Sequence, residues 1–289
     1  MISQNVVYNY PTIAKLSQFI VALIESPENG VAAKSHEAVI EDMISIYSKG
    51  LDAPLPESNA NSVPSTTVVL LTGSTGNLGA QILATLLSTE SVSKVYTLNR
   101  PSSKLSIEQR HKERFEDKGL NSSLLSSKKL VLLEGESSQP KLGLTDVVYG
   151  QLQESLTLVI HNAWRLDFNL SLSSFEPHIR GTRNLIDLAR SSRYASSLRF
   201  MFTSSIGSAQ SWNSSIMGPY PEKVISDPKY AVGPGYGESK YVSERVCGRW
   251  FSFLGDLPTF SHRFWRRAGY TLHLSASDKS PVVRMAPGL

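Results

Sequence analysis

Apolar residues recur at helical intervals near the start of the chain. One stripe follows Pro11-Thr12, which favour the start of a helix, and it ends before Pro27. Its members are Leu16, Phe19, Ile20, Leu23 and Ile24. A second stripe predicts a helix from about His36 to Ser48. Its members are Val39, Ile40, Met43, Ile44 and Tyr47. An isolated helix of the length of the first one is only marginally stable in water, so it needs a surface to pack against.

The pattern changes after the second helix. The segment LDAPLPESNANSVPSTT is rich in Pro, Ser and Asn and indicates a linker, so we place the main domain boundary at about residue 64. From Thr66 onward, continuous apolar runs alternate with helical stretches, as expected for strands buried on both faces of a sheet. The predicted strands are 67–72, 94–100, 129–135, 157–163 and 198–205. This alternation predicts an α/β fold, a Rossmann-like doubly wound parallel sheet with right-handed crossovers.

The turn after the first predicted strand reads Gly73-Ser74-Thr75-Gly76-Asn77-Leu78-Gly79. Gly73 permits a tight turn, Gly76 lets the backbone approach a pyrophosphate, and Gly79 lets the helix pack closely on the strand. The phosphates would then meet the N–H groups at the helix N-terminus. Because the glycines lie between a strand and a helix, they favour a dinucleotide site over a tight turn without a ligand.

The second predicted strand ends at Asn99-Arg100. An acidic residue here binds the ribose 2′-hydroxyl of NAD, whereas an arginine suits the 2′-phosphate of NADP, so the sequence favours NADP(H). Arg110, on the next predicted helix, is a second candidate for the phosphate, and an exposed helix position explains it equally well. The backbone of His161-Asn162-Ala163, at the end of the fourth strand, is expected to line the cofactor cleft, with His161 structural rather than catalytic.

Three residues suggest proton transfer. Tyr236 and Lys240 lie four apart in Tyr236-Gly-Glu-Ser-Lys240, so on a helix they share one face. An ammonium beside a phenol favours the phenolate, so we expect Lys240 to lower the pKa of Tyr236. Ser205 ends the fifth predicted strand, at the sheet edge where doubly wound folds hold ligands. A surface pair explains Tyr236 and Lys240 alone; the order of Ser205, Tyr236 and Lys240 after a dinucleotide turn favours catalysis.

The composition mainly excludes classes of protein and kinds of site. Of 289 residues, 40% are hydrophobic and 19% are charged, which excludes wholesale disorder. The longest apolar runs, VVLL and FIVALI, are far shorter than the roughly 20 residues that span a bilayer, so no membrane span is expected. The single cysteine, Cys247, excludes an internal disulfide and fits a reducing, cytoplasmic compartment. No His/Cys/Asp/Glu cluster has the spacing of a metal site, so we expect no metal.

The net charge of +4 is unevenly distributed. Residues 1–248 hold 23 basic and 23 acidic residues, so the excess lies wholly in the tail that follows. A basic balance confined to the tail does not indicate a nucleic-acid partner. The aromatic residues of that tail could suggest stacking on nucleic acid or a membrane surface, but irregular sequence that packs on the body, or that does not fold well, explains them better.

Three segments carry a family resemblance: VVLLTGSTGNLGAQILATLL, VIHNAWRLDFNLSLSSFEPHIRGTRNLIDLA and GYGESKYVSERV. They resemble the extended short-chain dehydrogenases/reductases. More narrowly, they resemble the thioester reductase domain of fungal NRPS-like enzymes, including aminoadipate and carboxylic acid reductases. The similarity runs from about Val6 to Val246. YNYPTIAKLSQFI resembles the last helix of an acyl carrier domain, and MISIYSKGLDAPLP resembles the linker that joins it to the reductase.

The resemblance implies a reaction. An acyl group arrives as a thioester on phosphopantetheine of a carrier domain, or as acyl-CoA, and NADPH reduces it to an aldehyde, with the alcohol of a second reduction as the alternative product. Ser205 would hydrogen-bond the carbonyl oxygen and Tyr236 would protonate it. Lys240 would lower the pKa of Tyr236 and hold the nicotinamide ribose. The Gly73–Gly79 turn and Arg100 would carry NADPH, and Asn162 and Ala163 would line its cleft.

The resemblance also divides the chain. Residues 1–30 would be the carrier remnant, 31–65 a helical segment and linker, 66–248 the NADP-binding domain and 249–289 an atypical tail with a sixth strand at 281–286. Residues 247–280 would then be an insertion, and most of the substrate domain would be missing. The carrier serine is absent, so a carrier must come from another chain. Gly135-Glu136 stands where the family has Gly-Asp, which weakens the expected adenine contact.

Two other functions stay open. The missing segments favour a catalytically inactive NADP-binding fragment or an interaction module. A third hypothesis is an extended short-chain enzyme on a free small molecule, such as a sugar-nucleotide epimerase, and the carrier-like N-terminus speaks against it. The sequence leaves the acyl group, the product and the oligomeric state open.

Overall fold

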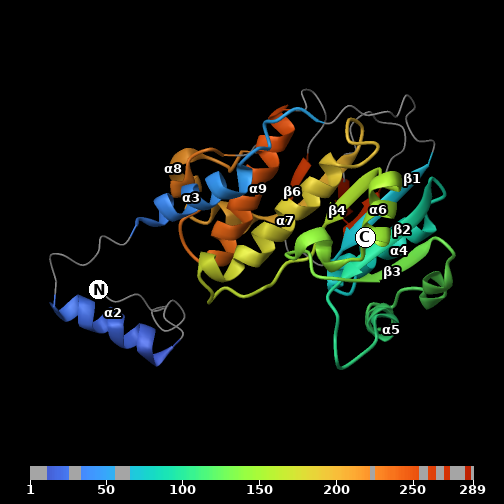
Figure 1. The fold of residues 1–289 in the computed structure, drawn as a ribbon, viewed down its shortest axis with the longest axis horizontal. Helices are drawn as coiled ribbons and strands as arrows, with labels where there is room; N and C mark the ends of the chain where they lie inside the picture. Colours follow the sequence, from blue (N-terminus) through green and yellow to red (C-terminus); the bar gives the residue numbers. More distant parts are fainter. Residues whose placement is uncertain are drawn as a thin grey trace.

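A six-stranded parallel sheet organises the protein (Figure 1). The computed structural model describes residues 12–25, 34–55, 66–221, 225–253, 260–264, 270–273 and 284–287, with side chains up to Trp250 apart from a few in the first helix. The strand order is β3-β2-β1-β4-β5-β6, which is the doubly wound arrangement predicted from the sequence. The strands are β1 (Thr67–Thr72), β2 (Val92–Asn99), β3 (Leu130–Glu134), β4 (Leu158–His161), β5 (Arg199–Ser205) and β6 (Phe260–Phe264).

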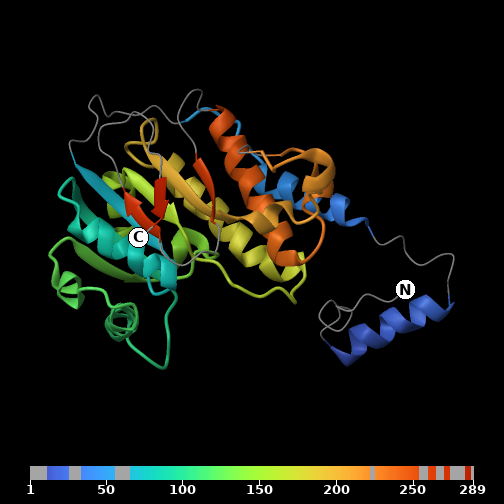
Figure 2. The same ribbon diagram turned by 180° about the vertical axis from the view of Figure 1, so that it is seen from behind.

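Helices cover both faces of the sheet. The α-helices of the body are α4 (Asn77–Ser88), α5 (Ile107–Asp117), α6 (Asp146–Ser155), α7 (Glu176–Arg190), α8 (Ser214–Met217) and α9 (Gly235–Phe253). Short 3-10 helices join them: η1 (Ser122–Ser126), η2 (Pro140–Gly143), η3 (Leu172–Phe175), η4 (Ile206–Ala209) and η5 (Pro228–Tyr230). Figure 1 looks onto the face covered by α7, and Figure 2 looks onto the face covered by α4.

Alternate residues of the strands pack into two separate hydrophobic cores, one on each face of the sheet. Leu70 of β1 packs into the core under α6, α7 and α9, whereas its neighbours Val69 and Leu71 pack into the core under α4 and α5. Successive side chains of a strand point to opposite faces, so a continuous apolar run fills both layers. The sequence VVLL of β1 therefore places the first strand in the middle of the sheet, where both of its faces are covered.

The second predicted helix is α3 (His36–Ser48), as expected, but it does not belong to a separate linker. Ile40 and Ile44 are fully or almost fully buried in the core that contains α7 and α9, and the other members of the stripe pack against it. Leu51, beyond the helix, is also fully buried in that core. The boundary predicted at about residue 64 therefore does not separate α3 from the body.

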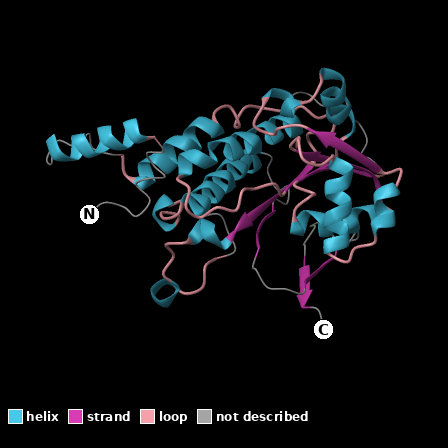
Figure 3. Cartoon of the chain, turned by 90° about the horizontal axis from the view of Figure 1, so that it is seen from below, coloured by secondary structure: helices cyan, strands magenta, loops and turns pink. Residues whose placement is uncertain are grey.

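The first predicted helix is α2 (Ile13–Glu25), and Figure 3 shows it apart from the body. The Thr12 hydroxyl accepts a hydrogen bond from the Lys15 N–H at 3.2 Å, which caps the helix start as the sequence suggested. Two members of its apolar stripe are exposed, Ile20 at 43% and Ile24 at 72%, whereas Leu16 and Phe19 are half-buried. The side chain of Leu23 lies outside the described residues.

The prediction of the sixth strand at 281–286 is wrong. β6 lies beside β5, with Met201 opposite Phe260 and Ser205 opposite Phe264. The later segment forms β8 (Arg284–Pro287), which pairs antiparallel with β7 (Tyr270–His273) in a separate sheet. That residues 247–280 are an insertion stays a prediction, because much of this stretch lies outside the described residues. None of the helices in the described ranges is both long and apolar enough to cross a membrane.

Candidate cofactor and active site at the carboxyl edge of the sheet

The glycine-rich turn closes tightly between β1 and α4. Gly73 has a φ of +73°, and a Cβ on it would lie 2.8 Å from the Cα of Ala163. A Cβ on Gly79 would lie only 2.0 Å from the carbonyl oxygen of Gly73. The Gly76 N–H donates to that same oxygen at 3.1 Å, and Gly76 is the N-cap of α4. The turn therefore presents the N-terminus of α4 at the carboxyl edge, where its first N–H groups lack partners within the helix.

The Ser74 side chain ties this turn to β2 and α5. Its buried hydroxyl accepts a hydrogen bond from Asn99 Nδ2 at 2.8 Å and lies 2.8 Å from His111 Nε2. His111 Nδ1 lies 2.7 Å from the carbonyl oxygen of Ile107, and a carbonyl only accepts, so Nδ1 carries the hydrogen. Burial lowers the pKa of His111, which keeps the ring neutral and Nε2 an acceptor for the Ser74 hydroxyl. The Ser74 side chain is thus committed to the body of the protein.

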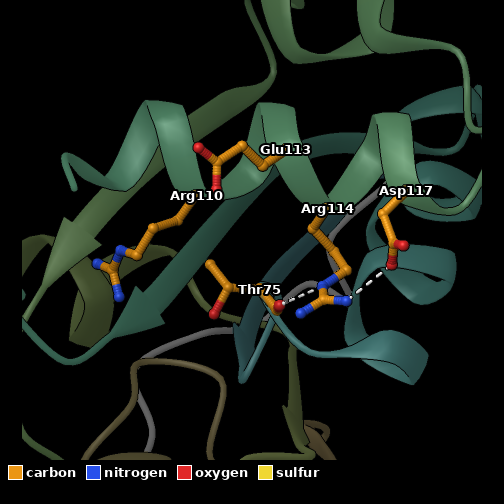
Figure 4. Close-up of a pocket in the computed structure, with 5 residues that line it drawn as sticks. All are labelled: Thr75, Arg110, Glu113, Arg114 and Asp117. Carbon is orange, nitrogen blue, oxygen red and sulfur yellow. Dashed lines mark hydrogen bonds and ion pairs between the residues drawn. The ribbon is translucent and has the colours of Figure 1, made fainter. Parts of the chain in front are cut away.

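Arginines surround the outer side of the turn. Asn99 is buried and its Oδ1 accepts from the Thr75 hydroxyl at 3.3 Å, while the next residue, Arg100, is exposed. A hollow of about 400 Å³ lies beside the turn. Its lining residues are Thr75, Arg110, Glu113, Arg114 and Asp117 (Figure 4).

Two arginines of α5 line this hollow and differ in their hydrogen-bond partners. Arg114 Nε donates to the Thr75 carbonyl at 3.0 Å, and its Nη1 donates to Asn77 Oδ1 and Asp117 Oδ2 at 2.9 Å each. Arg110 pairs with Glu134 at 3.1 Å, and its buried Nε has no hydrogen-bond partner among the described residues. The predicted residue Arg110 therefore lies beside the glycine-rich turn, with its guanidinium group held by Glu134.

A chain of hydrogen bonds fixes the segment after β4. Thr72 Oγ1 accepts from the N–H groups of Asn162 and Ala163 at 3.0 Å each, so its own hydrogen goes to His161 Nδ1 at 2.9 Å. His161 Nε2 then donates to Thr182 Oγ1 at 3.1 Å. Burial is the main reason why the pKa of His161 lies well below its usual range. His161 is a neutral, buried, structural histidine, as the sequence suggested.

Ser205 and Tyr236 meet at the end of β5. The Ser205 hydroxyl accepts from the Gly207 N–H at 3.1 Å and lies beside the Tyr236 side chain. Burial raises the pKa of Tyr236, and the nearby Ser205 hydroxyl partly offsets this rise. The expected lowering of that pKa by Lys240 is therefore wrong for this arrangement, because burial dominates and the opposing contribution comes from Ser205 rather than from Lys240.

Lys240 points into the protein instead. Its Nζ donates to the carbonyl oxygen of Thr203 at 2.6 Å and lies 4.1 Å from the ring centroid of Trp164. Complete burial lowers the pKa of Lys240 well below its usual range, and the buried carboxylate Glu244 opposes this shift. Since Trp164 follows Ala163, which touches Gly73, the lysine lies next to the segment that joins the two halves of the site.

Two glycines set the position of Tyr236. A Cβ on Gly235 would lie 2.3 Å from the carbonyl carbon of Ser171, and one on Gly237 would lie 2.2 Å from the carbonyl oxygen of Gly207. Gln210 holds the same turn, because its Nε2 donates to the carbonyl oxygens of Ala231 and Pro234 at 2.6 and 3.1 Å. The two glycines that flank Tyr236 are the sequence feature that could have predicted this close approach of the backbone.

Phe168 and His178 are site residues that the sequence did not reveal. The Phe168 ring, 61% exposed, lies 4.9 Å edge-on from the Tyr236 ring. The His178 ring lies 5.0 Å from Trp164. Desolvation, together with the charges of Arg100, Lys240 and Arg165, lowers the pKa of His178 to about 4. Only tertiary packing brings these side chains to the site.

The neutral state of His178 predicts a pH dependence of stability. Between pH 6.5 and about 4 the unfolded chain binds a proton at this residue that the folded chain does not, so stability falls as the pH falls. The expected loss approaches about 1.4 kcal/mol per pH unit. Urea unfolding at pH 7 and pH 5 should show a smaller loss for His178→Gln than for the unmodified chain. An equal loss in both proteins would contradict the assignment.

The comparisons with known proteins agree with this geometry. Residues 71–261 match the NAD-binding family described as male sterility protein. The chain belongs to this family. Membership of this family supports the assignment of the chain as an oxidoreductase that uses a nicotinamide cofactor. The glycine-rich turn lies where such a fold binds the cofactor's phosphates.

Two curated relatives have informative names. The chain is 50% identical over 253 residues to adenylate-forming reductase Nps11 of Serpula lacrymans, with 85% of this chain and 23% of the relative covered. It is 31% identical over 269 residues to a carboxylic acid reductase of Neurospora crassa, with 93% and 24% covered. The chain thus spans about a quarter of the length of these relatives.

Two solved structures share the fold. The terminal R domain of the myxalamid PKS-NRPS pathway has a TM-score of 0.63 and 25% identity, over 78% of this chain and 55% of that one. The reductase (R) domain of a non-ribosomal peptide synthetase from Mycobacterium tuberculosis has a TM-score of 0.54 and 24% identity, over 77% and 51%.

Proposed function

We propose that this chain is the cofactor-binding part of an NADPH-dependent thioester reductase, which reduces a carrier-bound acyl thioester to an aldehyde. The main support is the meeting of the Ser205 and Tyr236 hydroxyls at the carboxyl edge of the sheet that also carries the glycine-rich turn. The names of the relatives, adenylate-forming reductase and carboxylic acid reductase, support the same reaction class. The single cysteine fits a cytoplasmic setting.

The two hydroxyl groups have distinct roles in this proposal. When bound, the reduced nicotinamide supplies a hydride to the thioester carbonyl carbon. The Ser205 hydroxyl donates a hydrogen bond to the carbonyl oxygen, and Tyr236 gives its proton to that oxygen as negative charge develops there. Collapse of the hemithioacetal then breaks the carbon–sulfur bond and releases the aldehyde and the thiol. The raised pKa of Tyr236 suits an acid that keeps its proton until this step.

Lys240 serves the cofactor side of the site. Lys240 follows Tyr236 by one turn of α9, and a hydrogen bond to the Thr203 carbonyl holds its Nζ. We propose that Nζ contacts the nicotinamide ribose from there. Asn162 and Ala163 follow β4, and their backbone faces the glycine-rich turn through the contact of Ala163 with Gly73. A second reduction of the aldehyde to the alcohol would use the same groups.

Arg100 and Arg110 determine the choice of NADPH in this proposal. Asn99 is committed to Ser74 and Thr75, so the exposed Arg100 is the residue at the end of β2 that can meet a 2′-phosphate. We expect Arg100→Ala to raise the Kd for NADPH about 10- to 100-fold, the value of one charge-assisted contact, with little change for NADH. Fluorescence titration with both cofactors measures this. Lys94→Ala, at the other end of the same strand, is the matched control, and equal losses for both cofactors would refute the assignment.

The reaction itself is tested with the purified chain, NADPH and a panel of acyl-CoA and acyl-pantetheine thioesters. Loss of NADPH absorbance with release of an aldehyde would support the proposal, and product analysis would separate aldehyde from alcohol. NADPH binding without turnover of any thioester would instead favour a cofactor-binding fragment.

A further inference from the structure

A buried carboxylate lies inside the Tyr236–Lys240 motif. The side chain of Glu238 is only 4% exposed, and its Oε1 accepts from the Gly233 N–H at 3.2 Å. The same oxygen lies 2.7 Å from His36 Nδ1, a residue 202 positions earlier in the chain. Because Oε1 is already an acceptor, we assign the hydrogen of this contact to His36 Nδ1. The turn that carries Tyr236 is therefore tied to the start of α3.

His36 is held in place by the rest of its helix. It is the first residue of α3, which Ser35 caps by accepting from the Ala38 N–H at 3.2 Å. Ile40 and Ile44 anchor the helix in the core that contains α9, and Glu41 lies 3.8 Å from Arg245 of α9. Burial of two isoleucines fixes α3 more firmly than an exposed ion pair does.

The other end of α3 is tied to α7. Arg183 Nη1 donates to the carbonyl oxygens of Tyr47 and Lys49 at 2.8 and 2.7 Å, which satisfies carbonyl groups at the helix end. Arg190 donates in the same way to Leu51 and Ala53, at 2.8 Å each. Segment 36–53 thus spans the two helices that carry Tyr236 and His178 (Figure 1).

A small movement of this turn would displace Tyr236. Glu238 and Gly233 flank the start of α9, and Gly237 already packs against the carbonyl oxygen of Gly207, two residues beyond Ser205. A buried carboxylate that loses a donor must either find another or move toward water. Such a movement would shift the first turn of α9 and with it the distance between the two hydroxyl groups.

We propose that His36 is a positioning residue of the active site, through which α3 orders the turn of α9 that carries Tyr236. The proposal rests on the proposed function for its effect on turnover, but its effect on the order of this turn is independent of that function.

The test compares three variants of the full chain. His36→Ala removes the donor, and His36→Asn keeps an N–H near the position of Nδ1. As a control, Lys34→Ala breaks the exposed pair between Lys34, just before α3, and Asp42 of α3. Hydrogen exchange of residues 233–240, followed by mass spectrometry, is expected to be at least about threefold faster in His36→Ala. Exchange in His36→Asn and Lys34→Ala should match that of the unmodified chain.

Turnover provides the second measurement. With an active thioester, His36→Ala should lower kcat about three- to tenfold at an unchanged KM for NADPH, and His36→Asn should restore it. Unchanged exchange of residues 233–240 in His36→Ala would overturn the proposal, as would faster exchange with an unchanged kcat. If the unmodified chain turns over no thioester, the proposed function fails while the exchange experiment still decides whether α3 orders this turn.

Discussion

Tyr236→Phe is expected to lower thioester turnover by about 10²–10⁴-fold, the usual contribution of a positioned general acid, while NADPH binding is retained. The phenol hydroxyl is the group that Ser205 contacts, and its removal leaves the buried ring and its packing against Phe168 in place. Ser205→Ala should give a similar loss, because it removes the second donor for the carbonyl oxygen. Initial rates with a thioester and fluorescence titration with NADPH measure the two effects separately.

A matched control tests whether the loss is specific. Tyr149, on α6, is a half-buried tyrosine whose pKa is also raised, and its hydroxyl interacts with Ser191 away from the site. Tyr149→Phe should keep turnover within about twofold, as expected for a substitution outside the site. Turnover that persists in both Tyr236→Phe and Ser205→Ala would refute the catalytic assignment, and loss of NADPH binding in both would point to a structural role.

Gly79→Ala is expected to abolish tight dinucleotide binding. The new Cβ would lie 2.0 Å from the carbonyl oxygen of Gly73 and 2.9 Å from the Cα of Ser74, so backbone must move on one side of the turn. Overpacking of this kind costs about 1–3 kcal/mol of folding free energy or more. A misplaced N-terminus of α4 should weaken binding about 10²-fold, which titration with NADPH and thermal unfolding measure together.

Gly150 provides the control for this substitution. It lies within α6, and a Cβ there would meet nothing within 4 Å. Gly150→Ala should therefore stabilise the protein by about 0.5–1 kcal/mol, because alanine loses less backbone freedom in a helix. Unchanged NADPH affinity in Gly79→Ala would show that the tight turn is not needed for the cofactor.

Local patterns predicted most elements because each pattern reflects local chemistry. The run TVVLLT predicted β1 at 67–72, and the stripe through Ile40 and Ile44 predicted α3 from His36 to Ser48. A continuous apolar run needs cover on both faces, and a stripe needs one apolar neighbour, whatever that neighbour is. The stripe does not identify the neighbour, so the boundary predicted at about residue 64 places α3 outside the main domain, although α3 packs on α7 and α9.

The sequence by itself determined the glycine-rich turn, the end of β2 at Asn99-Arg100 and the spacing of Tyr236 and Lys240, because all three depend on neighbours along the chain. Only the tertiary structure decided that Lys240 faces Thr203, that burial raises the pKa of Tyr236 and that His36 meets Glu238. It also decided that β6, rather than residues 281–286, extends the sheet beside β5. Desolvation and contacts between distant segments exist only after the chain has packed, so no local pattern encodes them.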